Sequence, residues 1–175
     1  MTLWGKLLLV EVIKYFGLEE ALPLRSVKYG PYNRPFFEHS AFDFNISHAG
    51  EYAVCAGTLN NRVGIDIEMI KEINVLDFKN CFTKTEWDLI RRDKKRGEVF
   101  YETWTKKEAV LKSIGMGLHD DLSLIETTSG IARYLGKDYH IYPLKSIENY
   151  AMSVATAHPI CTKDIYVIEI EFKAS

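Results

Sequence analysis

Apolar residues recur along this chain with two different periods, and each period predicts one kind of secondary structure. From Leu3 to Phe16 the apolar positions lie three or four apart, which predicts an amphipathic helix with Gly17 as its C-terminal cap. Beyond it, Val, Ile, Tyr and Phe become frequent in short runs typical of strands. We expect these strands at 42–48, 52–59 and 63–68, with a tight turn at Asn60-Asn61.

The second half of the chain predicts two helices followed by strands. Thr83 and Glu86 have the spacing of a capping box, so a helix is expected from there to about Arg92. The longest helix is expected at 98–114, ended by Gly115 and Gly117. The other expected elements are a loop at 28–40, a short helix at 76–82, and strands at 122–126, 131–135, 138–144, 149–157 and 164–172.

A faint internal repeat suggests how these elements are organised. Residues 51–58 align without gaps with residues 149–156, and three of the eight positions are identical. If the repeat is real, the chain forms two similar lobes, each with a matching central strand. We place the boundary at Asn60-Asn61, which gives a first lobe at 1–60 and a second at 61–175. The natural position for a site is then the cleft between them.

Composition and charge exclude several classes of function. The net charge is −2 and no nucleic-acid-binding motif is recognisable, so nucleic acid is not an expected partner. No apolar run approaches the ~20 residues that span a bilayer. The three cysteines are scattered and odd in number, which fits a reducing, cytoplasmic environment.

One strand carries two carboxylates on a single face. Asp66 and Glu68 alternate with Ile65 and Ile67, so the isoleucines face the core and the carboxylates point the other way together. Two such side chains suit a hard cation that also binds substrate phosphates, such as Mg²⁺, and Mn²⁺ takes similar ligands. The alternative is a solvated strand face.

The longest expected helix holds an acid one turn before a base. Glu108 and Lys112 lie four residues apart on one helical face, with apolar residues between them and Trp104 one turn earlier. Glu108 suits a third metal ligand or a general base. The alternative is a surface ion pair, which contributes only ~0.3–0.5 kcal/mol.

Ser47 and His48 end the first expected strand, just before Ala49-Gly50. Inside a strand the two side chains would point to opposite faces, which excludes a hydrolase dyad. At the end of the strand both could reach a bound phosphate. The alternative is a capping serine and a structural histidine.

Three segments, in this order, resemble the motifs of the 4′-phosphopantetheinyl transferase superfamily. The family patterns F-N-[IL]-S-H, G-[IV]-D-[IV]-E and W-x-x-K-E-[AS]-x-x-K stand here at 44–48, 64–68 and 104–112. The larger, two-lobe class named after Sfp is most similar. The resemblance implies an α+β fold of two similar α/β lobes related by a pseudo-twofold axis. It also implies that the first lobe is incomplete, because larger members carry more residues before the first motif.

The resemblance also implies roles for individual residues. Asp66, Glu68 and Glu108 look like the magnesium ligands, and Glu108 and Lys112 look like the catalytic pair. The remaining set resembles the residues that bind coenzyme A, with Arg34 in place of the lysine in the family's G-K-P motif and with a less defined role for Lys107. This set is Arg34, Ser47, His48, Lys107 and Lys112.

The reaction implied by the resemblance moves phosphopantetheine from coenzyme A to a serine of an acyl or peptidyl carrier protein and releases 3′,5′-ADP. Residues 70–78 resemble the segment that meets the carrier protein, for which Ile73, Val75, Leu76 and Phe78 could supply an apolar docking patch. A shortened relative that only binds coenzyme A or carrier protein is the main alternative. A magnesium-dependent phosphohydrolase is a more distant one. Smaller members of the family, the holo-acyl-carrier-protein synthases, associate to build the site between chains. The resemblance therefore also allows a homodimer.

Overall fold

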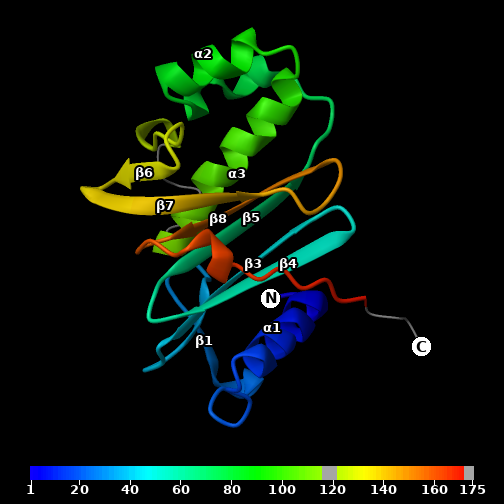
Figure 1. Cartoon of the computed structure of the whole chain (residues 1–175), viewed down its shortest axis with the longest axis vertical. Helices are drawn as coiled ribbons and strands as arrows, with labels where there is room; N and C mark the ends of the chain where they lie inside the picture. Colours follow the sequence, from blue (N-terminus) through cyan, green and yellow to red (C-terminus); the bar gives the residue numbers. More distant parts are fainter. Residues whose placement is uncertain (116–121, 172–175) are drawn as a thin grey trace.

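The computed structural model describes residues 1–115 and 122–171, which form a mixed α+β fold (Figure 1). The helices are α1 (Leu3–Tyr15), α2 (Lys84–Arg92) and α3 (Arg96–Ile114). The strands of the first half are β1 (Val27–Tyr29), β2 (Pro35–Phe37), β3 (Phe42–Ala49), β4 (Tyr52–Leu59) and β5 (Val63–Met69). The strands of the second half are β6 (Ile131–Tyr134), β7 (Lys137–Leu144) and β8 (Tyr150–Thr156). Among the described residues, no helix is long and apolar enough to span a bilayer.

Two layers of helix on antiparallel strands make up most of the molecule. α1 packs on the β3–β4 hairpin, where Leu9 and Ile13 meet Phe42 and Phe44. α3 lies across a four-stranded sheet of order β5-β8-β7-β6 (Figure 1). The apolar segment 109–111 of α3 fills the core on that sheet.

Side chains, rather than a backbone ladder, join β3 to β5. The carboxylate of Asp43 accepts the N–H of Val63 at 2.9 Å, and the amide oxygen of Asn45 accepts the N–H of Ile65 at 3.0 Å. A third contact, at 3.5 Å, runs from the Ile67 N–H to Ser47 Oγ. The offset is twenty residues at every step, so β3 and β5 run in the same direction. Each contact satisfies an N–H on the edge of β5 that faces away from its backbone partner, β8.

Gly64 lets α3 lie directly against β5. A Cβ atom at this position would stand less than 3.0 Å from both the Ala109 carbonyl oxygen and the Ser113 nitrogen of α3. No real side chain tolerates such a contact with backbone atoms. The glycine therefore sets the spacing between strand and helix, and it does so beside Asp66, Glu108 and Lys112.

Most elements lie where the sequence predicts them. The Thr83–Glu86 capping box begins α2, Gly17 and Gly115 adopt positive φ at helix ends, and Asn60 takes the left-handed conformation of the β4–β5 turn. The interval 28–40, expected as a loop, contains the short β1–β2 hairpin, and the expected helix at 76–82 is a 3₁₀ segment at Val75–Cys81. Gly117 lies outside the described residues.

Two expected strands are corrected by the structure. Residues Leu122–Leu124 form a 3₁₀ turn because Leu122 and Ile125 pack into the same core cluster, whereas a strand would point residues three apart to opposite faces. Residues 165–171 contain no assigned strand, although their apolar spacing resembles one. Residue 172, the last of that expected strand, lies outside the described residues.

The close approach at Gly64 generates a stability prediction. Gly64→Ala should lower the free energy of unfolding by about 2–3 kcal/mol, because the new methyl group pushes α3 away from β5. Urea denaturation measures this directly. Gly97→Ala is the matched control, since Gly97 lies in α3 with its nearest possible contact at 3.9 Å and helix propensity favours alanine. Equal stability of Gly64→Ala and the wild type would contradict the predicted role.

Candidate functional site

Asp66, Ser47 and Lys112 form a closed triangle of polar contacts where β3, β5 and α3 meet. Ser47 Oγ donates to Asp66 Oδ1 at 3.0 Å, and Lys112 Nζ donates to the same oxygen at 2.5 Å and to Ser47 Oγ at 2.8 Å. The Asp66 residue is only 3% exposed. As the sequence predicts, Ile65 and Ile67 face the core cluster, while Asp66 points to the other face of β5, toward α3.

Glu108 completes the polar cluster from the helix side. It lies one turn before Lys112 and is buried at 7% exposure. Glu108 Oε1 and Asp66 Oδ2 are buried without a hydrogen-bond partner in the described part of the chain. A buried carboxylate oxygen without a partner is costly, so it points to a ligand that satisfies it. Carboxylate oxygens of this kind match the preference of Mg²⁺ or Mn²⁺, so the residues present fit such a cation.

The three carboxylates hold excess negative charge. Burial, followed by the charge of Asp66, raises the pKa of Glu108 to about 7. Burial also raises the pKa of Asp66, and burial together with the charge of Asp66 raises the pKa of Glu68. The positive charge of Lys112 opposes all three shifts. Lys112 therefore neutralises the cluster only in part.

The carboxylates are near one another but are not gathered around one point. Within residues 1–115 and 122–171, no three His, Cys, Asp or Glu side chains are arranged as a ready-made ligand group for a metal ion. Repulsion between like charges explains this spacing, since a single ammonium is the main counter-charge for all three carboxylates. Side-chain movement is therefore needed before Asp66, Glu68 and Glu108 can share a cation.

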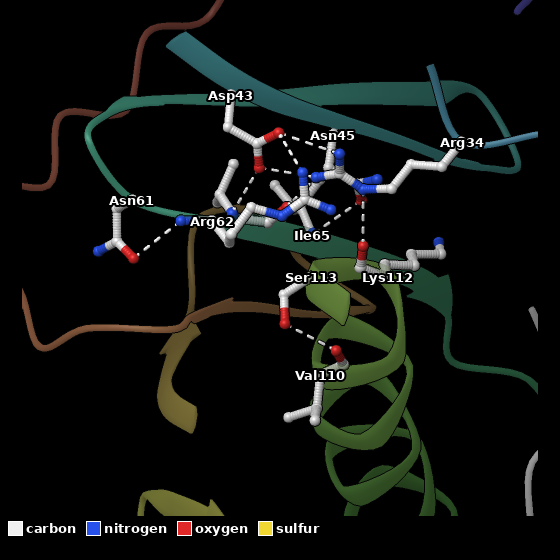
Figure 2. Close-up of polar contacts among 10 residues, drawn as sticks. Arg34, Asp43, Asn45, Asn61, Arg62, Ile65, Val110, Lys112 and Ser113 are labelled. Atoms are coloured by element: carbon white, nitrogen blue, oxygen red, sulfur yellow. Dashed lines mark hydrogen bonds and ion pairs between the residues drawn. The ribbon is translucent and has the colours of Figure 1, made fainter. Parts of the chain in front are cut away.

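Arg34 takes a structural position that corrects the expectation of a phosphate contact. Its guanidinium binds Asp43 with two hydrogen bonds, of 3.0 and 2.7 Å, and also donates to the carbonyl oxygens of Val63 and Lys112 (Figure 2). The residue is only 9% exposed. Arg34 thus connects β3, the start of β5 and the C-terminal turn of α3. Its guanidinium uses four hydrogen bonds for these contacts within the protein.

Lys107 also lies away from the predicted cofactor site. It is fully buried, and its ammonium contacts Glu86 Oε2 at 2.6 Å and the carbonyl oxygens of Leu122 and Ile125 at 2.8 and 2.5 Å. These contacts use all three of its donors. We therefore remove Lys107 from the candidate cofactor-binding residues. The sequence did contain a signal for this burial. Lys107 lies three residues after Trp104 and four before Leu111, which places it on the apolar side of α3.

Ser47 and His48 do not share a phosphate site in this arrangement. β3 continues to Ala49, so the two side chains point to opposite faces of a strand. Ser47 is buried within the polar triangle, whereas His48 is exposed. The structure therefore corrects the joint role: Ser47 orients Asp66 and Lys112, and His48 is separate from them.

The polar residues that hold β5 were missed by the sequence interpretation. Asp43 and Asn45 alternate with Phe42 and Phe44, so the same period-2 pattern that places Asp66 marks a polar face on β3. Arg62 was also missed; its Nη1 lies 3.3 Å from Asp43 Oδ1 (Figure 2). It borders a shallow pocket of about 300 Å³ that includes Phe36, Asn61 and His158 but none of the carboxylate cluster.

Comparison with known proteins shows which family this chain belongs to. The family model described as the 4′-phosphopantetheinyl transferase superfamily matches residues 62–155, which include β5, α3 and all but the last residue of β8. The 4′-phosphopantetheinyl transferase Sfp of Bacillus subtilis (strain 168) is 34% identical over 142 residues, covering 73% of this chain and 61% of its own length. A second 4′-phosphopantetheinyl transferase from Bacillus subtilis is 30% identical over 171 residues, covering 90% of this chain and 74% of its own length.

A more distant organism provides a third relative. The L-aminoadipate-semialdehyde dehydrogenase-phosphopantetheinyl transferase of Xenopus laevis is 36% identical over 113 residues, covering 58% of this chain and 37% of its own length. The chain thus spans 61% of Sfp and 37% of the Xenopus protein. The family model covers more than half of the chain, and a relative at 30% identity aligns with 90% of it. The chain therefore belongs to the 4′-phosphopantetheinyl transferase superfamily, a family of enzymes.

Proposed function

We propose that this protein transfers phosphopantetheine from coenzyme A to a serine of an acyl or peptidyl carrier protein, with Mg²⁺ as cofactor and 3′,5′-ADP as the second product. The observation that carries the proposal is the pair of buried, unpartnered oxygens, Asp66 Oδ2 and Glu108 Oε1, beside the ammonium of Lys112. Membership in the superfamily supports the reaction class.

Each residue of the cluster has a distinct task in this proposal. Asp66, Glu68 and Glu108 would hold the cation, which when bound neutralises the pyrophosphate of coenzyme A and orients it. Glu108, directly or through a water, takes the proton from the carrier serine. The serine oxygen then forms a bond to the phosphorus that carries pantetheine, and the pyrophosphate bond breaks. Lys112 stabilises the negative charge on the departing 3′,5′-ADP.

The two helix-on-strand layers correspond in our proposal to two lobes related by a pseudo-twofold axis. The first would contain α1 with β3 and β4, and the second α3 with β5 and β8. The matching segments 51–58 and 149–156 fall on β4 and β8, and the boundary at Asn60-Asn61 falls in the β4–β5 turn. The candidate site then lies between the lobes, where β3 meets β5.

The carrier protein would dock beside the 3₁₀ segment that follows β5. Leu76 is 67% exposed there, while Phe78 is half-buried against the aromatic rings of α3. An exposed leucine beside a half-buried aromatic ring is a suitable apolar contact for a carrier protein.

Intact-protein mass spectrometry of an apo carrier protein tests the proposed function. Incubation with this protein, coenzyme A and Mg²⁺ should add one phosphopantetheine group, and EDTA should prevent the addition. Asp66→Asn should slow the transfer by at least about 100-fold. Losing a residue that binds the cation directly costs more than losing one that only hydrogen-bonds to such a residue. Asp164→Asn, an exposed residue outside the cluster, is the charge-matched control. Binding of coenzyme A without transfer, to both fatty-acid and peptide carriers, would support the binding-only alternative.

The raised pKa of Glu108 predicts how stability depends on pH. Between the ordinary value of 4.5 and about 7, the folded protein holds a proton on Glu108 that the unfolded chain releases. The stability gained from keeping Glu108 protonated in the folded protein is therefore fully present below pH 4.5, and it is lost as the pH rises through 7. In metal-free buffer, raising the pH from 5 to 8 should lower the free energy of unfolding of the wild type by about 2–3 kcal/mol more than that of Glu108→Gln.

Urea denaturation at several pH values measures this difference. Glu102→Gln, on the same helix but half-exposed, serves as the control and should follow the wild-type pH dependence. Parallel curves for Glu108→Gln and the wild type would show that Glu108 does not take up a proton near neutral pH.

A further inference from the structure

Lys112 holds one oxygen of Asp66, the carboxylate whose free oxygen, Oδ2, the proposed cation would bind. Its ammonium lies 2.5 Å from Asp66 Oδ1 and 2.8 Å from Ser47 Oγ, so both short contacts of this lysine are made inside the carboxylate cluster. Asp66 Oδ1 also accepts from Ser47, which leaves it little capacity for another ligand. An ammonium on one oxygen of Asp66 and a divalent cation on the other would repel each other strongly in a buried site. The two therefore compete for Asp66.

The charge distribution around the cluster supports this competition. In the described part of the chain, the contact of Lys112 with Asp66 is the one ion pair that any of the three carboxylates makes. Lys112 is thus the counter-charge of the cluster. A divalent cation bound to the same carboxylates would take over this function and remove the attraction that holds the lysine in place.

We infer that Lys112 is a displaceable occupant of the cation site, and that binding of a divalent cation releases its ammonium toward the phosphates of the substrate. The inference rests on the proposed function, because it assumes that Asp66 and Glu108 bind the cation. When the cation binds alone, Lys112 loses its contacts with Asp66 and Ser47 and gains none. When coenzyme A is also bound, a phosphate group gives the released ammonium a new partner. The cation and coenzyme A therefore bind with positive coupling.

The structure permits this movement without a rearrangement of the helix. The side chain of Lys112 is 29% exposed, so its flexible stem has room to turn outward. Its backbone is held instead: Arg34 Nε donates to the Lys112 carbonyl oxygen at 3.0 Å, as Figure 2 shows. Gly64 fixes the position of α3 against β5 at the same level. Only the side chain is then expected to exchange partners.

Cation affinity in the absence of substrate tests the inference directly. Lys112→Met keeps the length of the apolar stem and removes the competing charge, so it should bind Mn²⁺ or Mg²⁺ roughly 10-fold more tightly than the wild type. Isothermal titration calorimetry with the metal alone measures the dissociation constant. Lys106→Met removes the same charge from the same helix, outside the cluster, and should change the affinity less than about 2-fold.

The coupling provides a second readout. In the wild type, coenzyme A without carrier protein should tighten Mn²⁺ binding roughly 10-fold, and this effect should be smaller in Lys112→Met, where only the attraction between the cation and the pyrophosphate remains. Equal or weaker cation binding by Lys112→Met would overturn the inference even if the wild type transfers phosphopantetheine. Transfer that persists in EDTA would instead overturn the metal in the proposed function, so the two failures are distinguishable.

A measurement on the wild type covers the case in which Lys112→Met does not fold. With ¹³C-labelled lysine, the NMR signal of the Lys112 side chain should shift when Mg²⁺ is added alone, because its ammonium leaves Asp66. An unchanged signal at saturating Mg²⁺ would overturn the inference.

Discussion

The contacts between the polar face of β3 and the backbone of β5 are the constraint on which the candidate site depends. Asp43, Asn45 and Ser47 each accept an N–H from the edge of β5 that β8 leaves free. Because an unpaired buried N–H is costly, these contacts fix the register between the two strands. The last of them, Ser47, also binds Asp66 and Lys112. The same row of side chains therefore joins the two sheets and contacts the candidate site.

On the α3 side, the cluster depends on a glycine in β5. Gly64 brings α3 close enough for Glu108 and Lys112 to face Asp66, and Arg34 holds the end of that helix through the Lys112 carbonyl oxygen. Closely packed backbones thus surround a cluster of carboxylates with one lysine. This combination gives a site with too much negative charge for one lysine, and it supports the proposal that a divalent cation binds there.

The sequence was most informative where a regular period determines which side chains share a face. The alternation of Ile65, Asp66, Ile67 and Glu68, and the spacing of Glu108 and Lys112, predicted the face of each residue, and the capping box predicted the start of α2. It was less informative for Arg34 and Lys107, whose partners come from segments far away in the chain. A positive charge in a family motif suggests a phosphate ligand, but packing turned both residues into buried structural contacts. The strand predicted at 122–126 failed for a related reason, since packing in the core favoured a 3₁₀ turn.

A crystal structure of the protein with Mn²⁺ and coenzyme A would test the central claim most directly, because the anomalous signal of Mn²⁺ locates the cation independently of the protein atoms. The account predicts Mn²⁺ bound to Asp66 and Glu108, with the Lys112 ammonium moved from Asp66 to a phosphate of coenzyme A. A cation bound elsewhere, or Lys112 still paired with Asp66 beside the bound metal, would contradict it.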